Sequence, residues 1–261
     1  MARGEELADE QWAVIEPHLP ELPTREDGRG RPWRGNREVM DGILRVLRSG
    51  ARWKDLPGRF PPYQTCHRRF QQWVKDGSLR RVLEALAEDL RTRGDLDLSE
   101  CFIDGTFIVA KKGGRRVGTT KRGKGTKLMV VADFHGLPLA ADAQSAGPHE
   151  VTLVRDALQA RFTRERPRRL VGDRAYDSDP LDRELAAEGV ELIAPHRSNR
   201  SKARTQDGRM LRRYRRRWKV ERLNAWLQNF RRIATRFEYH VENYLGFVHL
   251  GCIKILLRCY L

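Results

Sequence analysis

Hydrophobic positions in the first hundred residues recur with the 3.6-residue period of amphipathic helices. Four such groups follow one another: Trp12, Ile15 and Leu19; Val39, Ile43, Val46 and Leu47; Phe70 and Trp73; and Leu79, Val82, Leu83, Leu86 and Leu90. Each group comes after a polar residue that favours a helix start, namely Asp9, Asn36, Thr65 and Ser78. The pattern therefore predicts a helical region over residues 1–95.

From Cys101 onward the pattern changes to short apolar runs separated by turn residues. It predicts five strands, near 101–107, 127–133, 137–144, 169–173 and 191–194. It also predicts helices over 149–162, 178–188 and, as one long element, 208–233. This order of strands and helices is typical of an α/β architecture, so we expect residues 96–261 to form a mixed five-stranded sheet with flanking helices.

Three acidic residues stand out against this background. Asp104 interrupts the apolar run 101–107, Asp173 ends the run 170–173, and Glu221 lies in a strongly basic helical stretch. A carboxylate in or beside a buried strand is costly unless a cation or hydrogen bonds hold it. Because hard divalent cations prefer oxygen ligands, the three acids indicate a metal site.

Other polar residues near these runs have simpler explanations. Asp133 precedes His135 and Gly136 and is expected to shape a turn. Asp177 or Ser178 is expected to cap the following helix. His149 is an isolated histidine, whose commoner roles are hydrogen bonding and packing, so it is left out of the predicted site.

The charge of the chain points to a polyanionic partner. The sequence has 51 Lys and Arg against 35 Asp and Glu, a net charge of +16, which favours nucleic acid. The alternative is a basic protein without such a partner. The segment from Arg197 to Lys219 contains one acid, Asp207, and is either a phosphate-contacting surface or a solvated loop.

Four cysteines are present without a C-x-x-C pair, and we expect reduced thiols in a cytoplasmic protein, since the N-terminus also lacks a signal-peptide pattern. The apolar run 244–261 is interrupted by His249, Lys254 and Arg258. It is expected to be a buried helix, because a membrane span needs about 20 mostly uncharged residues.

On the last predicted helix, a turn of 100° per residue places Tyr214, Arg217, Glu221 and Gln228 on one narrow face. The opposite face carries an apolar stripe made of Leu223, Trp226, Leu227 and Phe230. The polar face is either an ordinary solvated surface or the border of an active site.

At this point the chain resembles the DDE transposases of bacterial insertion sequences, in the insertion-sequence-five group. The family carries a Y-x2-R-x3-E-x6-K pattern, which Tyr214, Arg217 and Glu221 match, with Gln228 in place of the Lys. The family's other two acids match Ile103-Asp104-Gly105-Thr106 and Asp173-Arg174-Ala175-Tyr176. N-terminal runs also look familial: Asp9-Glu10-Gln11-Trp12, Gly30-Arg31-Pro32-Trp33 and Trp53-Lys54-Asp55-Leu56-Pro57.

The resemblance implies a ribonuclease-H-like catalytic domain that holds two Mg²⁺ ions, or Mn²⁺, on Asp104, Asp173 and Glu221. It implies cleavage of double-stranded DNA at terminal inverted repeats and strand transfer into target DNA. It further implies a homodimer or larger assembly, a nucleoid-associated protein in the bacterial cytoplasm, and no membrane partner. The expected DNA contacts on the last helix are Tyr214, Arg217 and Gln228, with Arg232 as a substitute for the missing Lys. Arg68 and Arg69 of a helix-turn-helix-like N-terminal region are either further DNA contacts or surface arginines of an ordinary helical bundle.

Two other functions remain compatible with parts of this pattern. A non-catalytic DNA-binding regulator, or an inactive transposase copy, would explain the charge and the N-terminal helices but not the three acids in matching contexts. A different ribonuclease-H-like nuclease would share the metal site but would need no end-specific N-terminal region. Inverted repeats flanking the gene would separate these alternatives from a transposase.

Overall fold

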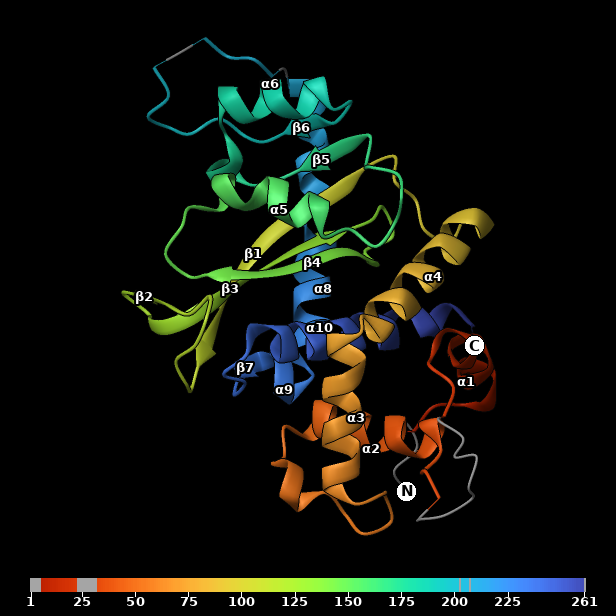
Figure 1. Ribbon diagram of the computed structural model, residues 1–261. Helices are drawn as coiled ribbons and strands as arrows, with labels where there is room; N and C mark the ends of the chain where they lie inside the picture. The colour runs from red at the N-terminus through yellow and green to blue at the C-terminus, as the bar shows by residue number, and fades with distance from the viewer. Residues whose placement is uncertain (1–5, 23–31, 202, 207, 261) are drawn as a thin grey trace.

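A computed structural model describes residues 6–22, 32–201, 203–206 and 208–260 (Figure 1). Helices occupy both ends of the chain, and a sheet lies between them in sequence. The α-helices are α1 (Asp9–Ile15), α2 (Asn36–Ser49), α3 (Tyr63–Lys75), α4 (Ser78–Arg93), α5 (Val154–Gln159), α6 (Asp179–Ala187), α7 (Gly208–Leu211), α8 (Trp218–Gln228), α9 (Arg231–Ala234) and α10 (Val241–Leu256).

The sheet is mixed, as predicted. Its strands are β1 (Cys101–Ala110), β2 (Gly118–Thr120), β3 (Gly123–Ala132), β4 (Pro138–Ser145), β5 (Arg169–Val171), β6 (Glu191–Ile193) and β7 (Thr235–Arg236). The long strands β4, β3 and β1 pair antiparallel, whereas β5 and β6 continue the sheet parallel to β1. The five predicted strands are all present, and the short strands β2 and β7 were not predicted.

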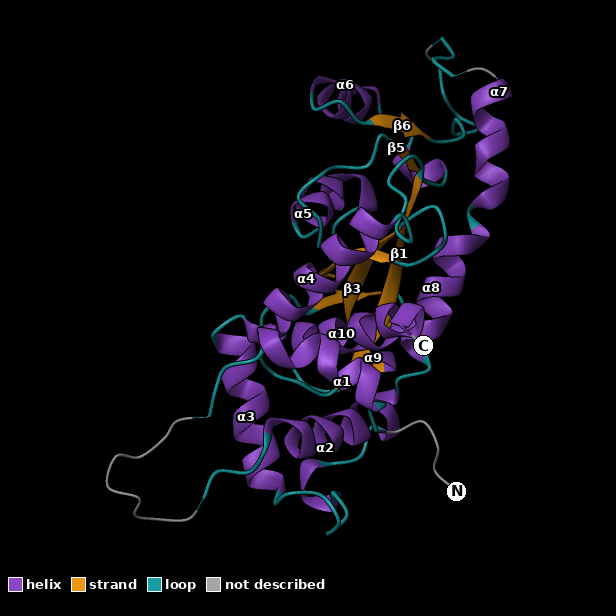
Figure 2. Cartoon of the chain, turned by 90° about the vertical axis from the view of Figure 1, so that its right-hand side faces the viewer, coloured by secondary structure: helices purple, strands orange, loops and turns teal. Residues whose placement is uncertain are grey.

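Helices cover both faces of this sheet. Figure 2 shows α5 and α6 on one side of the strands and α8 on the other. Helix α8 packs on β1 and β3, while α5 packs on β4 and β3. Because both faces are covered, β3 is apolar and buried from Leu128 to Ala132 without alternation.

Helix α10 joins the N-terminal helices to the sheet. It is almost wholly buried and packs against α2, α3, α4 and β4, so one hydrophobic cluster extends from Leu7 to Leu257. Within the described residues no helix is long and apolar enough to span a membrane. The division at residues 95 and 96 remains a prediction, because the two regions share this core.

The single long helix predicted over 208–233 is wrong. The segment forms α7, a 3-10 helix (Arg212–Arg216), α8 and α9, with a break at Asn229 and Phe230. Tertiary contacts explain the break, since α9 packs on the end of α2. There Gly50, with φ of 68°, comes so close that a Cβ would lie 2.9 Å from the Cβ of Arg231.

The predicted helix over 149–162 is also shorter than expected. A 3-10 helix (Glu150–Leu153) leads into α5, which ends at Gln159. The chain then pairs with β4 through a bridge between Ala140 and Arg161, so residues 160–162 follow the sheet instead of continuing the helix.

Candidate active site

Asp104 lies in the middle of β1 and faces α8. Its Oδ2 accepts a hydrogen bond from Asn224 Nδ2 at 2.9 Å, and its Oδ1 accepts one from Arg217 Nη1 at 3.1 Å. Burial raises the pKa of the Asp104 carboxyl, and the negative charge of Asp173 adds to this, although Arg217 opposes both. The two hydrogen bonds therefore fix the position of the carboxylate, while burial and the charge of Asp173 still disfavour its ionised form.

Arg217 brings the three predicted acids together. Its guanidinium lies 3.1 Å from Asp104 Oδ1, 2.8 Å from Glu221 Oε1 and 4.0 Å from Asp173 Oδ2. Glu221 is one helical turn after Arg217, as the i,i+4 spacing predicts, and its side chain is 55% exposed. The structure thus places Asp104, Asp173 and Glu221 around one positive charge.

This donor set is chemically suited to a divalent cation. All three side chains offer carboxylate oxygens, the ligand type that Mg²⁺ and Mn²⁺ prefer. Among the described residues no three acidic, histidine or cysteine side chains form a ready-made metal cluster. The carboxylates surround the Arg217 guanidinium instead, so an ion would take over the charge that Arg217 supplies. The three carboxylates therefore fit a divalent ion, provided that the ion replaces the Arg217 guanidinium as their source of positive charge.

Asp173 is fixed by the turn that follows β5. Its side chain accepts a hydrogen bond from the backbone N–H of Ala175 at 2.7 Å and caps a short 3-10 helix (Arg174–Tyr176). Asp177 follows this 3-10 helix directly, and its side chain, which is 5% exposed, binds His196 Nδ1 at 2.9 Å and Arg200 Nη1 at 3.0 Å. Ser178, not Asp177, caps α6.

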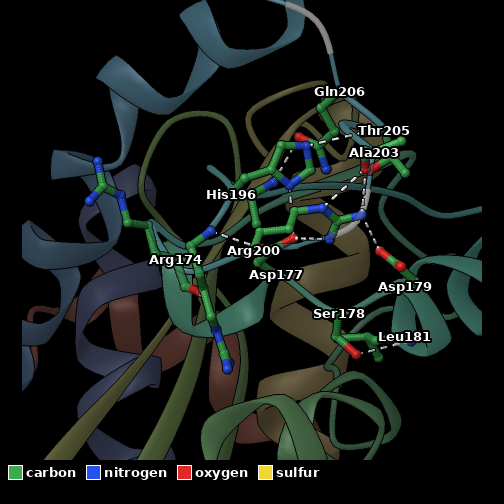
Figure 3. A network of polar contacts seen from close by, with 12 residues as sticks. Arg174, Asp177, Ser178, Asp179, Leu181, His196, Arg200, Ala203, Thr205 and Gln206 are labelled. Carbon is green, nitrogen blue, oxygen red and sulfur yellow. Dashed lines mark hydrogen bonds and ion pairs between the residues drawn. The ribbon is translucent and has the colours of Figure 1, made fainter.

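Figure 3 shows how this network connects Arg200, in the basic segment before α7, to the turn that contains Arg174 and Asp177. Arg200 also bonds to Asp179 at 2.6 Å, and Arg197 donates to the carbonyls of Arg174 and Ala175. The described part of the loop before α7 is therefore anchored to the turn that carries Asp173.

The basic segment is also attached to the sheet by Glu100. That carboxylate is 2% exposed and lies 2.5 Å from Arg213 Nη1 and 3.1 Å from Arg216 Nε. Arg212, which precedes Arg213, and Arg215, which lies between Arg213 and Arg216, are both exposed. The segment thus alternates arginines that fix it to the fold with arginines that face solvent.

The remaining predicted DNA contacts divide into accessible and buried residues. Tyr214 is partly exposed, with its ring 5.9 Å from the Arg217 guanidinium, and Gln228 is exposed at the end of α8. Arg232 is buried, binds Glu238 at 2.7 Å and donates to the carbonyl of Ala51 at 3.2 Å. Arg232 therefore joins α9 to the end of α2, and its guanidinium is not exposed for the DNA contact expected from the sequence.

The two arginines of α3 differ in the same way. Arg68 is exposed, whereas Arg69 is buried, donates a hydrogen bond to Asn36 Oδ1 and stacks on Trp33 and Trp73. Helices α3 and α4 are joined by the two residues Asp76 and Gly77, a connection shorter than the turn of about 3–4 residues typical of a helix-turn-helix, so that motif remains a prediction. The linker between α2 and α3 covers residues 50–62 and is too long for that role.

Sequence reasoning missed Asn224 and Glu150. Asn224 lies one helical turn after Glu221, so the i,i+3 spacing was an available signal. Glu150 lies beside β1 at Gly105, a proximity created by the sheet that no local pattern indicates. Asp133 shapes a turn as predicted, accepting hydrogen bonds from the N–H groups of His135 and Leu137.

Comparisons with known proteins agree with the site. Residues 7–83 match the family described as a putative transposase of the IS4/5 family, and residues 96–253 match the transposase DDE domain. The uncharacterized 16.2 kDa protein of insertion element IS402 from Burkholderia cepacia is 39% identical over 117 residues, covering 44% of this chain and 80% of that protein. The putative transposase of IS402 from the same organism is 37% identical over 145 residues, covering 52% of this chain and 65% of that protein.

Among solved structures, the piggyBac transposase in its synaptic complex with hairpin DNA superposes with a TM-score of 0.53. It is 13% identical, and the match covers 96% of this chain and 71% of that one, which supports the ribonuclease-H-like fold alone. The family matches and the relatives carry the assignment further: the chain belongs to the DDE transposases of the IS4/IS5 type, enzymes that cleave DNA and transfer strands and generally use a divalent metal ion.

Proposed function

We propose that this transposase binds the terminal inverted repeats of an insertion sequence, cleaves DNA at those ends and joins the freed strand to target DNA. The supporting observation is the convergence of Asp104, Asp173 and Glu221 on the single guanidinium of Arg217. Three carboxylates from β1, the turn after β5, and α8 meet there. Carboxylates come this close only when a positive charge is shared among them. Arg217 supplies that charge in this structure, and divalent ions would supply it in the proposed site.

Asp104, Asp173 and Glu221 would hold two Mg²⁺ ions, with Mn²⁺ as a substitute. When bound, such ions stabilise the charge on the attacking and leaving oxygens of a phosphodiester displacement. The protein's own side chains set the geometry. Asn224 orients the Asp104 carboxylate, and the N–H of Ala175 orients that of Asp173. Arg217, always charged and able to bind phosphate with two N–H groups, would then contact the DNA backbone.

The proposed DNA surface borders this site. Exposed Arg212 and Arg215 precede α8, and Tyr214 and Gln228 flank Glu221 along the chain. These residues would contact phosphates close to the scissile bond, while Arg68 on α3 would contact the inverted repeat. Because cleaving and joining two ends requires at least two active sites, a homodimer or larger assembly is part of the proposal.

A DNA cleavage assay with a charge-neutral variant tests this function. Labelled duplex DNA carrying the gene's own flanking ends is incubated with Mg²⁺ and wild-type protein, Asp104→Asn or Asp156→Asn. Asp156 is the matched control, an exposed carboxylate on α5 that bonds to Gln144. Wild type and Asp156→Asn are expected to nick the DNA at the element boundary, whereas Asp104→Asn binds the ends without cutting.

Two outcomes would contradict the proposal. Equal cleavage by Asp104→Asn would remove Asp104 from the catalytic set. End binding without cleavage by any of the three proteins would favour a regulator or an inactive copy, for which the Gln228 departure from the family Lys is the relevant sequence difference.

A further inference from the structure

A fourth carboxylate, Glu150, lies beside the three of the triad. It begins the 3-10 helix that leads into α5 and approaches β1 at Gly105, next to Asp104. A Cβ built on Gly105 would lie 2.8 Å from Glu150 Cδ and 3.0 Å from its Oε1. The missing side chain at position 105 is therefore what allows the carboxylate to reach the strand.

The edge of the sheet is open at this point. β5 pairs with β1 only at Cys101 and Phe102, and β7 pairs with it only at Val109 and Ala110. Between these pairs, within the described residues, no strand covers that edge of β1. Asp104 points toward α8 and Gly105 toward the α5 side, because successive strand residues alternate faces. The edge of β1 beside Asp104 and Gly105 is therefore not covered by another strand.

The negative charge of Glu150 is only partly balanced by a nearby positive charge. Its ion pair with Lys127 is long, 3.7 Å from Nζ to Oε1, and the Lys127 ammonium also donates to the carbonyl of Pro148 at 2.7 Å. Burial raises the pKa of the Glu150 carboxyl, and the charges of Asp104 and Asp173 raise it further, against the opposing effect of Lys127. Glu150 therefore shares the electrostatic environment of the triad.

A buried hydroxyl group gives an independent sign of a missing ligand. Tyr176 is fully buried, with its ring packed over Gly172. Burial raises the pKa of its phenol, and the charges of Glu150, Asp104 and Asp173 raise it further. Its hydroxyl lies close enough to Glu150 to lower that carboxyl's pKa, yet it makes no hydrogen bond of good geometry with any described residue. A buried phenol without a partner is costly, and a ligand or its bound water would satisfy it.

We propose that Glu150 is a fourth carboxylate of the divalent-cation site and contributes to ion binding together with Asp104 and Asp173. This inference rests on the proposed function, since it places Glu150 at the cation site that the triad forms. The competing explanation is purely structural: Glu150 would serve only to pair with Lys127 and hold the start of α5.

Titration of the metal-free protein with Mn²⁺, followed by calorimetry, separates the two explanations without relying on catalysis. Glu150→Gln keeps the shape of the side chain and removes its charge. It is expected to weaken Mn²⁺ binding at least about tenfold, as loss of a supporting group at a metal site commonly does. Asp104→Asn is the positive control, and Asp156→Asn, an exposed carboxylate nearby, is expected to leave the affinity unchanged.

Lys127→Ala provides the decisive comparison. If Glu150 binds the ion, removal of its competing partner leaves Mn²⁺ affinity equal or higher. If Glu150 serves only the ion pair, Lys127→Ala and Glu150→Gln weaken binding alike, and the inference is overturned. Unchanged affinity in Glu150→Gln with a loss in Asp104→Asn would also overturn it while leaving the proposed function intact. No Mn²⁺ binding by wild type, or no loss in Asp104→Asn, would contradict the triad site itself.

Discussion

Arg217 is the residue on which the arrangement of the acids depends. Its planar guanidinium bonds to Asp104 and Glu221 at once and lies 4.0 Å from Asp173. Without that charge, the half-buried Asp104 carboxylate would keep only Asn224 as a side-chain partner among these residues. Arg217 thus makes the cluster of negative charge tolerable and occupies the place that an ion would take.

Replacing Arg217 with Lys tests this role. A lysine keeps the charge but cannot bond to two carboxylates in a fixed fork. We expect the free energy of unfolding without divalent ions to fall by about 1–3 kcal/mol, the cost of leaving a buried acceptor unsatisfied. Saturating Mn²⁺ should shrink the difference, because the ion supplies the same charge. Urea denaturation with and without Mn²⁺ measures both values.

Arg212→Lys, at an exposed position two residues before Tyr214, is the control and should change little. An equal loss for Arg217→Lys in both conditions would mean that Arg217 supports the fold independently of the cation site.

At the scale of elements, α10 is the joint between the N-terminal helices and the sheet. Gly246 lies where α10 meets α3, and a Cβ there would come within 2.4 Å of Val74 Cγ2 and 3.1 Å of Phe70 Cζ. The two helices approach this closely because position 246 has no side chain. The stacked rings of Phe70 and Phe247, with centroids 4.4 Å apart, complete the contact.

The variant Gly246→Ala is therefore expected to destabilise the protein by about 1–3 kcal/mol through overpacking. This outweighs the gain of about 1 kcal/mol that Ala brings to an open helix. In Gly208→Ala the new Cβ meets nothing within 4 Å, so that variant of α7 should be neutral or slightly stabilising. Equilibrium unfolding in urea compares them, and a Gly246→Ala protein as stable as wild type would contradict the close approach.

The sequence predicted elements better than it predicted how they meet. Apolar runs located the five main strands, and local motifs selected Asp104, Asp173 and Glu221 as candidates, which the structure places around Arg217. The break after Gln228 was missed because it results from packing of α9 on α2. That break is also why Arg232, expected beside Gln228, is buried against Glu238.

Adjacent residues show the same limit. Arg68 and Arg69 have equal chemistry, and only packing decides that Arg68 is exposed while Arg69 is buried beside Trp73. Glu150 and Gly105 are 45 positions apart in the sequence. Their contact depends on the pairing of the sheet, which no periodic pattern encodes.

Across the whole molecule, the net charge determines the kind of binding partner, whereas the burial of single ionisable groups determines how stability depends on pH. The net charge of +16 suits a polyanion, and arginines from several elements are held by buried acids. In the shared core, His249 of α10 packs edge-on against Phe162 at 6.0 Å. Burial lowers the pKa of the His249 ring well below 6.5, and the nearby charge of Arg80 lowers it further.

This shift predicts how stability responds to acid. Below pH 6.5 the unfolded chain protonates His249 while the folded chain does not, so stability falls as the pH decreases toward the folded pKa. The loss should approach about 1.4 kcal/mol per pH unit for this one group. Relative to His249→Phe, wild type should lose stability between pH 6.5 and pH 5 in urea titrations. Parallel pH profiles for the two proteins would contradict the assignment.

In the proposed function, the triad carboxylates hold the divalent ions that support DNA cleavage. Cleavage by Asp104→Cys in Mg²⁺ and in Mn²⁺ tests it most directly, because Mg²⁺ requires hard oxygen ligands whereas Mn²⁺ is the softer of the two ions. We predict that wild type cuts the element ends with either ion. Asp104→Cys should lose at least about 100-fold in rate with Mg²⁺, equivalent to about 2.7 kcal/mol, and recover much of it with Mn²⁺. Undiminished cleavage by Asp104→Cys in Mg²⁺ would show that Asp104 does not bind the catalytic ion.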